Sequence, residues 1–198
     1  MRIIEPLRAG NIYHIFNRGI NSENIFEQTR NYYYFLDKYK EYCTDILETY
    51  AYALLKNHFH LMVKVKENIK VSRRDGNGEI ELNASKQLSH FFNCYAQSIN
   101  AAYHRHGKLL EEPFRRVLID NDQYFTTLIK YIHFNPQHHN FVGDFREWQF
   151  TSWHSIQNDS DTFIARERVF EWFGSKENFE NVHLEKLAAD SILQYTFE

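Results

Sequence analysis

The chain has 198 residues, 43% of them hydrophobic and 17% aromatic, which is enough to form the core of one medium-sized domain, alone or with an appendage. The two cysteines, Cys43 and Cys94, lie far apart in segments with helical spacing, so we expect reduced thiols and exclude a disulfide framework. No segment has the pattern of a signal peptide or the length of a transmembrane helix. We therefore expect a globular protein of the cytoplasm.

Charge is distributed unevenly along the chain. The formal net charge is −3, but nine acids and four bases fall from Asp159 onward, so the part before it carries +2. Residues 56–74 hold six bases against one acid, Glu67. Such a basic segment attracts a phosphate backbone, although a solvated loop rich in lysine has the same charge pattern.

The first half of the chain predicts three strands and one helix. Residues 11–17 alternate as a strand does, and Gly19 marks a turn after them. Residues 29–44 have apolar side chains at helical spacing, with Thr29 as the candidate N-cap. Residues 49–55 and 58–66 predict two strands joined at hairpin length, and residues 68–79 predict a loop.

Two histidines begin the third strand. Side chains alternate between the faces of a strand, so His58 and His60 share one face while Phe59 lies on the other. Two imidazoles on one rigid face are half of a metal site. Further ligands must come from another part of the chain, and the alternative is a pair of partly buried histidines that bond only to neighbouring side chains.

The second half predicts two longer helices around one strand. Residues 82–103 form an amphipathic pattern closed by Gly107, and residues 115–120 predict a short strand. Residues 120–122 offer N-caps for a helix that we expect to end at about Asn135, because the residue before a proline disfavours the helical conformation. Tyr131 and Asn135 lie one turn apart on one face of this helix.

The order strand, helix, strand, strand, helix, strand, helix predicts an α+β fold. It is typical of a ferredoxin-like split βαβ antiparallel sheet with helices on one face. We expect residues 1–156 to form this domain. Residues 157–198 contain short apolar clusters, and we interpret them as a helical C-terminal extension packed on the core.

Four motifs occur in a fixed order. They are Gly-Asn-Ile-Tyr-His-Ile-Phe-Asn-Arg-Gly at residues 10–19, Ile-Phe at 25–26, Asn-His-Phe-His-Leu at 57–61 and Tyr-Ile-His-Phe-Asn-Pro at 131–136. Together they resemble the IS200-like single-tyrosine transposases, and most closely the branch of REP-associated tyrosine transposases. The resemblance covers roughly residues 10–156, including a tryptophan-and-serine segment at 148–155, and residues 157–198 lie outside it.

The resemblance implies a histidine-hydrophobic-histidine endonuclease that cuts and joins single-stranded DNA. By position, Tyr131 would be the nucleophile, and His58, His60 and Asn135 would be metal ligands. Imidazole and amide oxygen ligands suit Mg²⁺ or Mn²⁺, and the absence of nearby thiolates argues against a closed zinc site. A phenol with a pKa of about 10 needs a nearby cation to attack a phosphate, giving a 5′-phosphotyrosine and a free 3′-OH.

The expected partner is hairpin-forming single-stranded DNA, bound by a monomer or a homodimer. The candidate nucleic-acid contacts are basic residues, namely Arg18, Lys64, Lys66, Arg73, Arg74, Arg115 and Arg116. His133, His138 and His139 are further candidates for proton transfer. A second His-x-His pair, His104 and His106, lies at a helix end, where we expect solvated or DNA-facing side chains.

The chain departs from the family pattern after Asn-Pro, at residues 137–142, and before the last strand, at residues 111–116. Both departures concern target recognition more than cleavage. The alternative function is a domesticated module that binds hairpin DNA or RNA without cutting it. A metal-dependent phosphodiesterase acting on small nucleotides is a more distant third.

Overall fold

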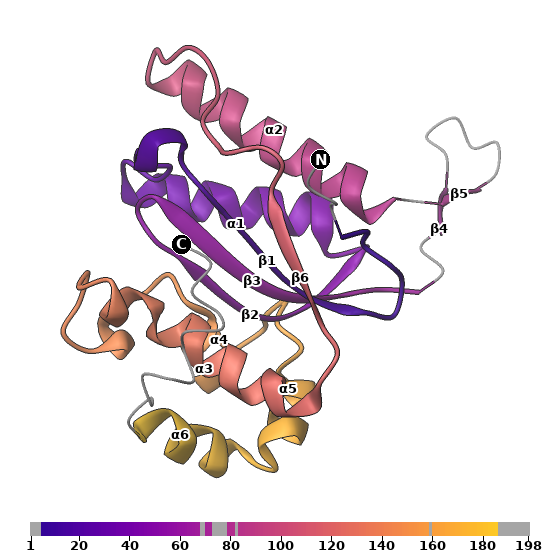
Figure 1. The fold of residues 1–198 in the computed structure, drawn as a ribbon, viewed down its shortest axis with the longest axis vertical. Coiled ribbons are helices and arrows are strands. Elements are labelled where there is room, and N and C mark those ends of the chain that lie inside the picture. The colour runs from indigo at the N-terminus through magenta and orange to yellow at the C-terminus, as the bar shows by residue number, and fades with distance from the viewer. Residues whose placement is uncertain (1–4, 68–69, 73–78, 82, 159, 186–198) are drawn as a thin grey trace.

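A computed structural model of the chain describes residues 5–67, 70–72, 79–81, 83–158 and 160–185. Its centre is a four-stranded sheet in the order β2-β3-β1-β6, with every neighbouring pair antiparallel (Figure 1). The strands are β1 (Ile12–Arg18), β2 (Leu47–Leu54), β3 (His58–Val65) and β6 (Arg115–Ile119). The predicted α+β fold with an open split βαβ sheet is confirmed.

The segment predicted as a loop contains a small second sheet. Strands β4 (Lys70–Ser72) and β5 (Glu79–Glu81) pair antiparallel as a short hairpin beside the main body (Figure 1).

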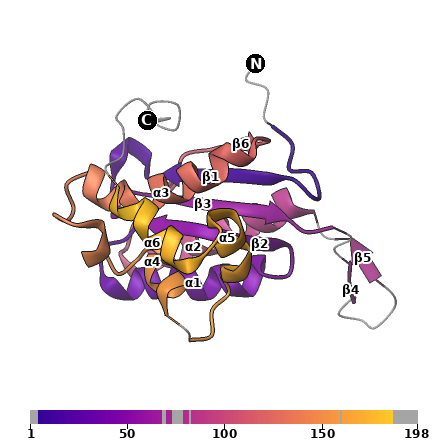
Figure 2. The same ribbon diagram turned by 90° about the horizontal axis from the view of Figure 1, so that it is seen from below.

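Helices lie on both sides of the main sheet. The prediction that the helices share one face holds only for those at residues 29–43 and 84–102. The helix at residues 122–138 and the C-terminal helices pack on the other face, as Figure 2 shows from below. The helices are α1 (Thr29–Cys43), α2 (Ala84–Ala102), α3 (Asp122–His138), α4 (Ser152–Gln157), α5 (Arg166–Phe173) and α6 (Lys176–Leu184), with 3-10 turns η1 (Ile20–Ser22) and η2 (Phe145–Glu147). Among the described residues, no helix is both long and apolar enough to cross a membrane.

The pleat of β3 separates the core from the site. Phe59 is fully buried on the side of α1 and α2, with ring centroids 5.2 Å from Phe35 and 5.3 Å from Phe92. Aromatic rings at these separations add to the burial of apolar area. The packing of Phe59 therefore directs the side chains on either side of it, His58 and His60, to the face covered by α3.

Two predicted helix ends differ from the structure. The N-cap of α1 is Gln28, not Thr29, because Gln28 and Asn31 form a reciprocal capping box. Helix α3 does not end at Asn135 but continues through Pro136 to His138. Proline removes only its own N–H donor, and the backbone N–H of His139 still bonds the Asn135 carbonyl at 3.0 Å, so the turn is kept.

Gly19 shapes the turn after β1. A Cβ atom at this position would lie 2.0 Å from the Glu23 carbonyl oxygen, which excludes any larger residue without movement of the backbone. The Gly19 N–H donates to the Asn57 carbonyl at 2.8 Å. This bond joins the end of β1 to the start of β3, where His58 lies.

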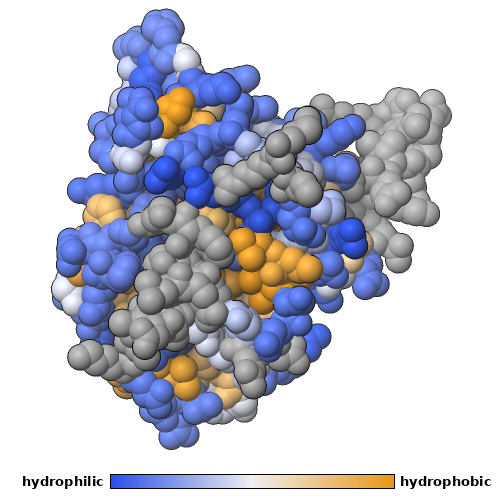
Figure 3. Space-filling model, viewed as in Figure 1, coloured by the Kyte–Doolittle hydropathy of each residue, from blue (hydrophilic) through white to orange (hydrophobic). Residues whose placement is uncertain are grey.

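Most of the face shown in Figure 3 is polar, and the largest of its apolar areas lies where β6 crosses it. This agrees with the partial burial of Val117 and Leu118, which pack against the core from an edge strand. Charged side chains flank them, since Arg115 and Arg116 precede them on the same strand.

A buried chain of hydrogen bonds attaches α6 to α3. His183 on α6 donates from Nδ1 to the Phe179 carbonyl at 2.7 Å, which leaves Nε2 to accept from His133 Nδ1 at 2.9 Å. His133 Nε2 then accepts from the Ser152 hydroxyl at 2.7 Å, and Ser152 Oγ accepts from the Tyr52 N–H at 2.9 Å. Each imidazole is neutral in this arrangement, and burial lowers the pKa of His183 to about 4.

This network predicts acid-sensitive folding. His183 has a pKa of about 4 in the folded protein and about 6.5 in the unfolded chain. Its contribution to the free energy of unfolding is therefore complete above pH 6.5 and is lost as the pH falls toward 4. Between pH 7 and pH 5 the loss is about 2 kcal/mol for this residue. Urea unfolding of a His183→Gln variant should show a pH dependence weaker by that amount. His90→Gln, at an exposed histidine, is the control, and an equal pH dependence in wild type and His183→Gln would contradict the assignment.

Candidate active site

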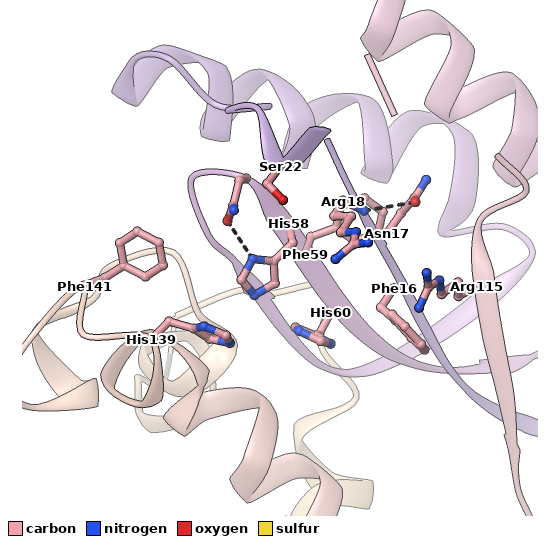
Figure 4. Close-up of a pocket in the computed structure, with 11 residues that line it drawn as sticks. Phe16, Asn17, Arg18, Ser22, His58, Phe59, His60, Arg115, His139 and Phe141 are labelled. Carbon is pink, nitrogen blue, oxygen red and sulfur yellow. Dashed lines mark hydrogen bonds between the residues drawn. The ribbon is translucent and has the colours of Figure 1, made fainter. Parts of the chain in front are cut away.

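A cavity of about 200 Å³ opens where β1 ends and β3 begins (Figure 4). His58 and His60 form one wall, and Arg18, Arg115 and His139 are among the other lining residues. The histidines come from the centre of the sheet, and His139 comes from the end of α3. The cavity thus lies between the sheet and the helix that carries Tyr131 and Asn135.

His58 lies between two side-chain oxygens. Its Nδ1 is 2.8 Å from Asn57 Oδ1, and its Nε2 is 2.9 Å from Asn135 Oδ1. A neutral imidazole has one N–H, so it can donate to only one of these oxygens. A cation held by both Nε2 and Oδ1 would resolve the conflict, since neighbouring ligands of an octahedral Mg²⁺ lie about 3 Å apart.

His60 lines the same cavity. It is 3% exposed, and its Nε2 is buried with no hydrogen-bond partner among the described residues. Burial lowers the pKa of His60 well below its usual value, and His14, His58 and His139 lower it further. His60 is therefore neutral, which is the form that binds a metal.

These residues fit a divalent ion with open coordination positions. His58 Nε2, His60 Nε2 and Asn135 Oδ1 are two imidazoles and one amide oxygen, a mixture compatible with Mg²⁺ or Mn²⁺. No three His, Cys, Asp or Glu side chains form a metal-binding group in the described part of the chain, so the third protein ligand here would be the Asn135 amide.

Tyr131 lies directly behind the histidines. Its ring is edge-on to His60, with centroids 5.6 Å apart, and to His14 at 6.3 Å. The residue is 2% exposed and packs on the histidine face from α3. The structure thus brings together the four residues proposed for the centre, His58, His60, Tyr131 and Asn135.

The predicted basic residues separate into two groups. Arg18 and Arg115 line the cavity, and both approach Glu111, at 2.7 Å and 3.5 Å respectively. A phosphate bound at the opening of the cavity would therefore have to compete with the Glu111 carboxylate for these two guanidinium groups.

The remaining basic residues lie elsewhere. Lys64 and Lys66 lie at and just beyond the far end of β3, where Lys66 donates to the Thr44 carbonyl at 2.6 Å. Arg116 points to the opposite face from Arg115, lies 3.8 Å from the Phe114 ring centroid and donates to Ser85. Arg73 and Arg74 fall outside the described residues.

Two site residues have positions that the sequence did not predict: His14 was not among the candidates, and His139 was named only for proton transfer. His139 packs edge-on to His58 with centroids 4.8 Å apart, and its position depends on the continuation of α3 past Pro136. His14 is fully buried beside His60, and burial lowers its pKa to about 3. Alternation along β1 places His14 on one face, but only the strand pairing shows that this face is the one with the histidines. His133, a predicted proton carrier, lies on α3 and belongs to the buried hydrogen-bond network that attaches α6 to α3.

The fold is known among solved structures. A REP-associated tyrosine transposase bound to a REP hairpin superposes with a TM-score of 0.60 over 79% of this chain and 84% of that one, at 14% identity. A Haemophilus influenzae protein named "Putative REP-associated tyrosine transposase" is 27% identical over 126 residues, which cover 61% of this chain and 67% of the relative. No family model matches the chain. The resemblance to REP-associated tyrosine transposases predicted from the motifs is confirmed.

The site geometry predicts where a metal binds. Replacing His58 and His60 together by alanine should abolish Mn²⁺ binding, measured by electron paramagnetic resonance titration, because it removes both imidazole ligands. The double variant His104→Ala/His106→Ala is the matched control, since that pair has the same spacing but is exposed. Equal Mn²⁺ binding by the two variants would place the metal elsewhere.

Proposed function

We propose that the protein is a metal-dependent nicking and joining enzyme that acts on hairpin-forming single-stranded DNA. The observation that carries this proposal is the convergence of Tyr131 and Asn135 from α3 with His58 and His60 from β3. The similar solved structure is bound to a REP hairpin, which supports DNA of that shape as the substrate.

The chemistry follows from the positions of the side chains. His58, His60 and Asn135 would hold Mg²⁺ or Mn²⁺, which when bound neutralises the scissile phosphate and favours the phenolate. The Tyr131 oxygen attacks the phosphorus, the bond from phosphorus to the 3′-oxygen breaks, and the 3′-oxygen takes up a proton. The product is a 5′-phosphotyrosine and a 3′-OH. Attack by a 3′-OH reverses these steps, so joining requires no ATP.

Tyr131 must become accessible for this reaction. At 2% exposure its side chain does not contact solvent enough to meet a phosphodiester, whose oxygens would enter the cavity in front of His58 and His60. We therefore infer that DNA binding shifts α3 or rotates the phenol toward the cavity. Only a local movement is needed, because Asn135, one turn after Tyr131 on α3, already contacts His58 at the cavity.

The cavity mouth suits a phosphate backbone. Arg18 and Arg115 approach it from β1 and β6, and Lys56 lies 5.9 Å from the Phe141 ring centroid on the other side. Charge-assisted bonds from the two guanidinium groups would position a strand over the histidines. Phe141, a lining residue, offers an aromatic surface on which an unpaired base can stack.

The burial of Tyr131 also favours a second candidate, a module that binds hairpin nucleic acid without cleavage. Such a module would bind equally well with and without a chelator and would leave no covalent product.

Covalent chemistry provides the direct test. Incubation with a hairpin oligonucleotide and Mn²⁺ should yield a protein–DNA adduct, seen as a shifted band on a denaturing gel. Tyr131→Phe should yield none, because it removes the attacking oxygen. Tyr124→Phe, at a half-buried tyrosine earlier on α3, should leave the adduct unchanged. An adduct formed by Tyr131→Phe would refute the nucleophile, and the absence of any adduct with wild type would favour the binding module.

Salt dependence tests the cavity mouth. If Arg18 and Arg115 each neutralise one phosphate, Arg18→Ala or Arg115→Ala should reduce the slope of log K against log salt by about 0.7 for single-stranded DNA. Fluorescence anisotropy between low and moderate salt measures this slope. Arg168→Ala, at an exposed arginine on α5 paired with Glu171, should leave it unchanged. A slope unchanged in all three variants would place the DNA on another surface.

A further inference from the structure

His14 is a buried imidazole next to a proposed metal ligand. It lies on β1 two residues before Phe16, which pairs directly with His60 on β3. Its ring plane is within 23° of that of His60, the centroids are 5.1 Å apart, and its Nε2 is 2.9 Å from His60 Nδ1. No part of His14 is exposed, so solvent does not compete for this bond.

The two imidazoles share one hydrogen bond that has two possible directions. If His14 donates from Nε2, His60 carries its proton on Nε2, and no lone pair faces the cavity. If His60 donates from Nδ1, its Nε2 presents a lone pair instead. Either direction leaves two buried nitrogens unbonded, one with a proton and one with a lone pair, since neither His14 Nδ1 nor His60 Nε2 has a hydrogen-bond partner among the described residues.

A cation at His60 Nε2 removes this ambiguity. It engages the lone pair and makes the second direction the stable one, so metal binding and the orientation of the His14–His60 bond depend on each other. We propose that His14 is a positioning residue for the metal site, an inference that rests on the proposed function. His14 Nε2 accepts a hydrogen bond from His60 Nδ1 and so holds the Nε2 lone pair of His60 toward the cavity.

Two further aromatic rings pack against His14. Its centroid is 4.8 Å from that of Phe16 and 6.3 Å from that of Tyr131, which meets it edge-on. His14 thus contacts both a proposed ligand and the proposed nucleophile. A shift of its ring would move the His60 plane and the phenol together.

A neutral acceptor has a consequence for the ion. A histidine ligand commonly bonds through its second nitrogen to a carboxylate or a carbonyl. A carboxylate in the place of His14 would offset part of the charge of a divalent ion, whereas an imidazole does not. The positive charge then remains available for the phosphate oxygens.

Two substitutions at His14 separate hydrogen bonding from packing. His14→Phe keeps the ring volume but cannot accept from His60, and it should weaken Mn²⁺ binding about 10- to 100-fold. His14→Gln offers an oxygen that can accept the same bond, and it should restore most of the affinity. His90→Phe, at an exposed histidine on α2, is the control for the substitution. Titration calorimetry with Mn²⁺ measures binding, and thermal unfolding shows that each variant is folded.

Spectroscopy of the wild type gives a readout that does not depend on variants. In Mg²⁺, long-range ¹H–¹⁵N correlation spectra should show His60 protonated at Nδ1. Protonation at Nε2, or Mn²⁺ affinities of His14→Phe equal to wild type, would overturn the role of His14 while leaving the metal site in place. Equal weakening in His14→Phe and His14→Gln would also overturn it. A wild-type protein that binds no Mn²⁺ would overturn the proposed metal site and this inference together.

Discussion

The contact between Asn135 on α3 and His58 on β3, at 2.9 Å, is the interaction on which the account of this protein depends. It joins a helix from the last part of the ferredoxin-like unit to a strand from its centre, with both residues buried. An oxygen and an imidazole nitrogen at that separation need either a shared proton or a shared cation. Because Tyr131 lies one turn earlier on the same helix, this contact also sets the place of the phenol relative to the histidines.

Strand register determines which side chains surround this contact. β1 pairs with β3 so that Phe16 lies opposite His60 and Arg18 lies opposite His58. A slip of one residue would exchange the faces and turn the Arg18 side chain away from the histidines. Gly19 holds the register through its bond to the Asn57 carbonyl, and the size limit at Gly19 is therefore a constraint on the site as well as on the turn.

The parts of the site that could be predicted are those governed by local periodicity. Strand alternation places His58 and His60 on one face, and helical spacing places Tyr131 and Asn135 one turn apart. His14 could not be assigned because its role depends on pairing between strands 46 residues apart. Lys64 and Lys66 were predicted as nucleic-acid contacts, and their distance from the histidines could not be judged from their closeness in sequence. At about 3.3 Å per residue, however, a strand carries its far end about 20 Å away in six residues.

The C-terminal helices tie the site to the stability of the molecule. The network from His183 to His133 and Ser152 bonds α6 to α3 between the turns that carry Tyr131 and Asn135. This network could not be predicted from the sequence, because the residues that form it come from four separate helices and strands. Any displacement of α3 during the reaction must keep or break these bonds, whose neutral form is favoured above pH 6.5.

The most direct measurement is anomalous diffraction from crystals soaked in Mn²⁺. The account predicts one strong peak within about 2.0–2.3 Å of His58 Nε2, His60 Nε2 and Asn135 Oδ1. A peak at another group of side chains, or none at this site with the cavity accessible in the lattice, would contradict it.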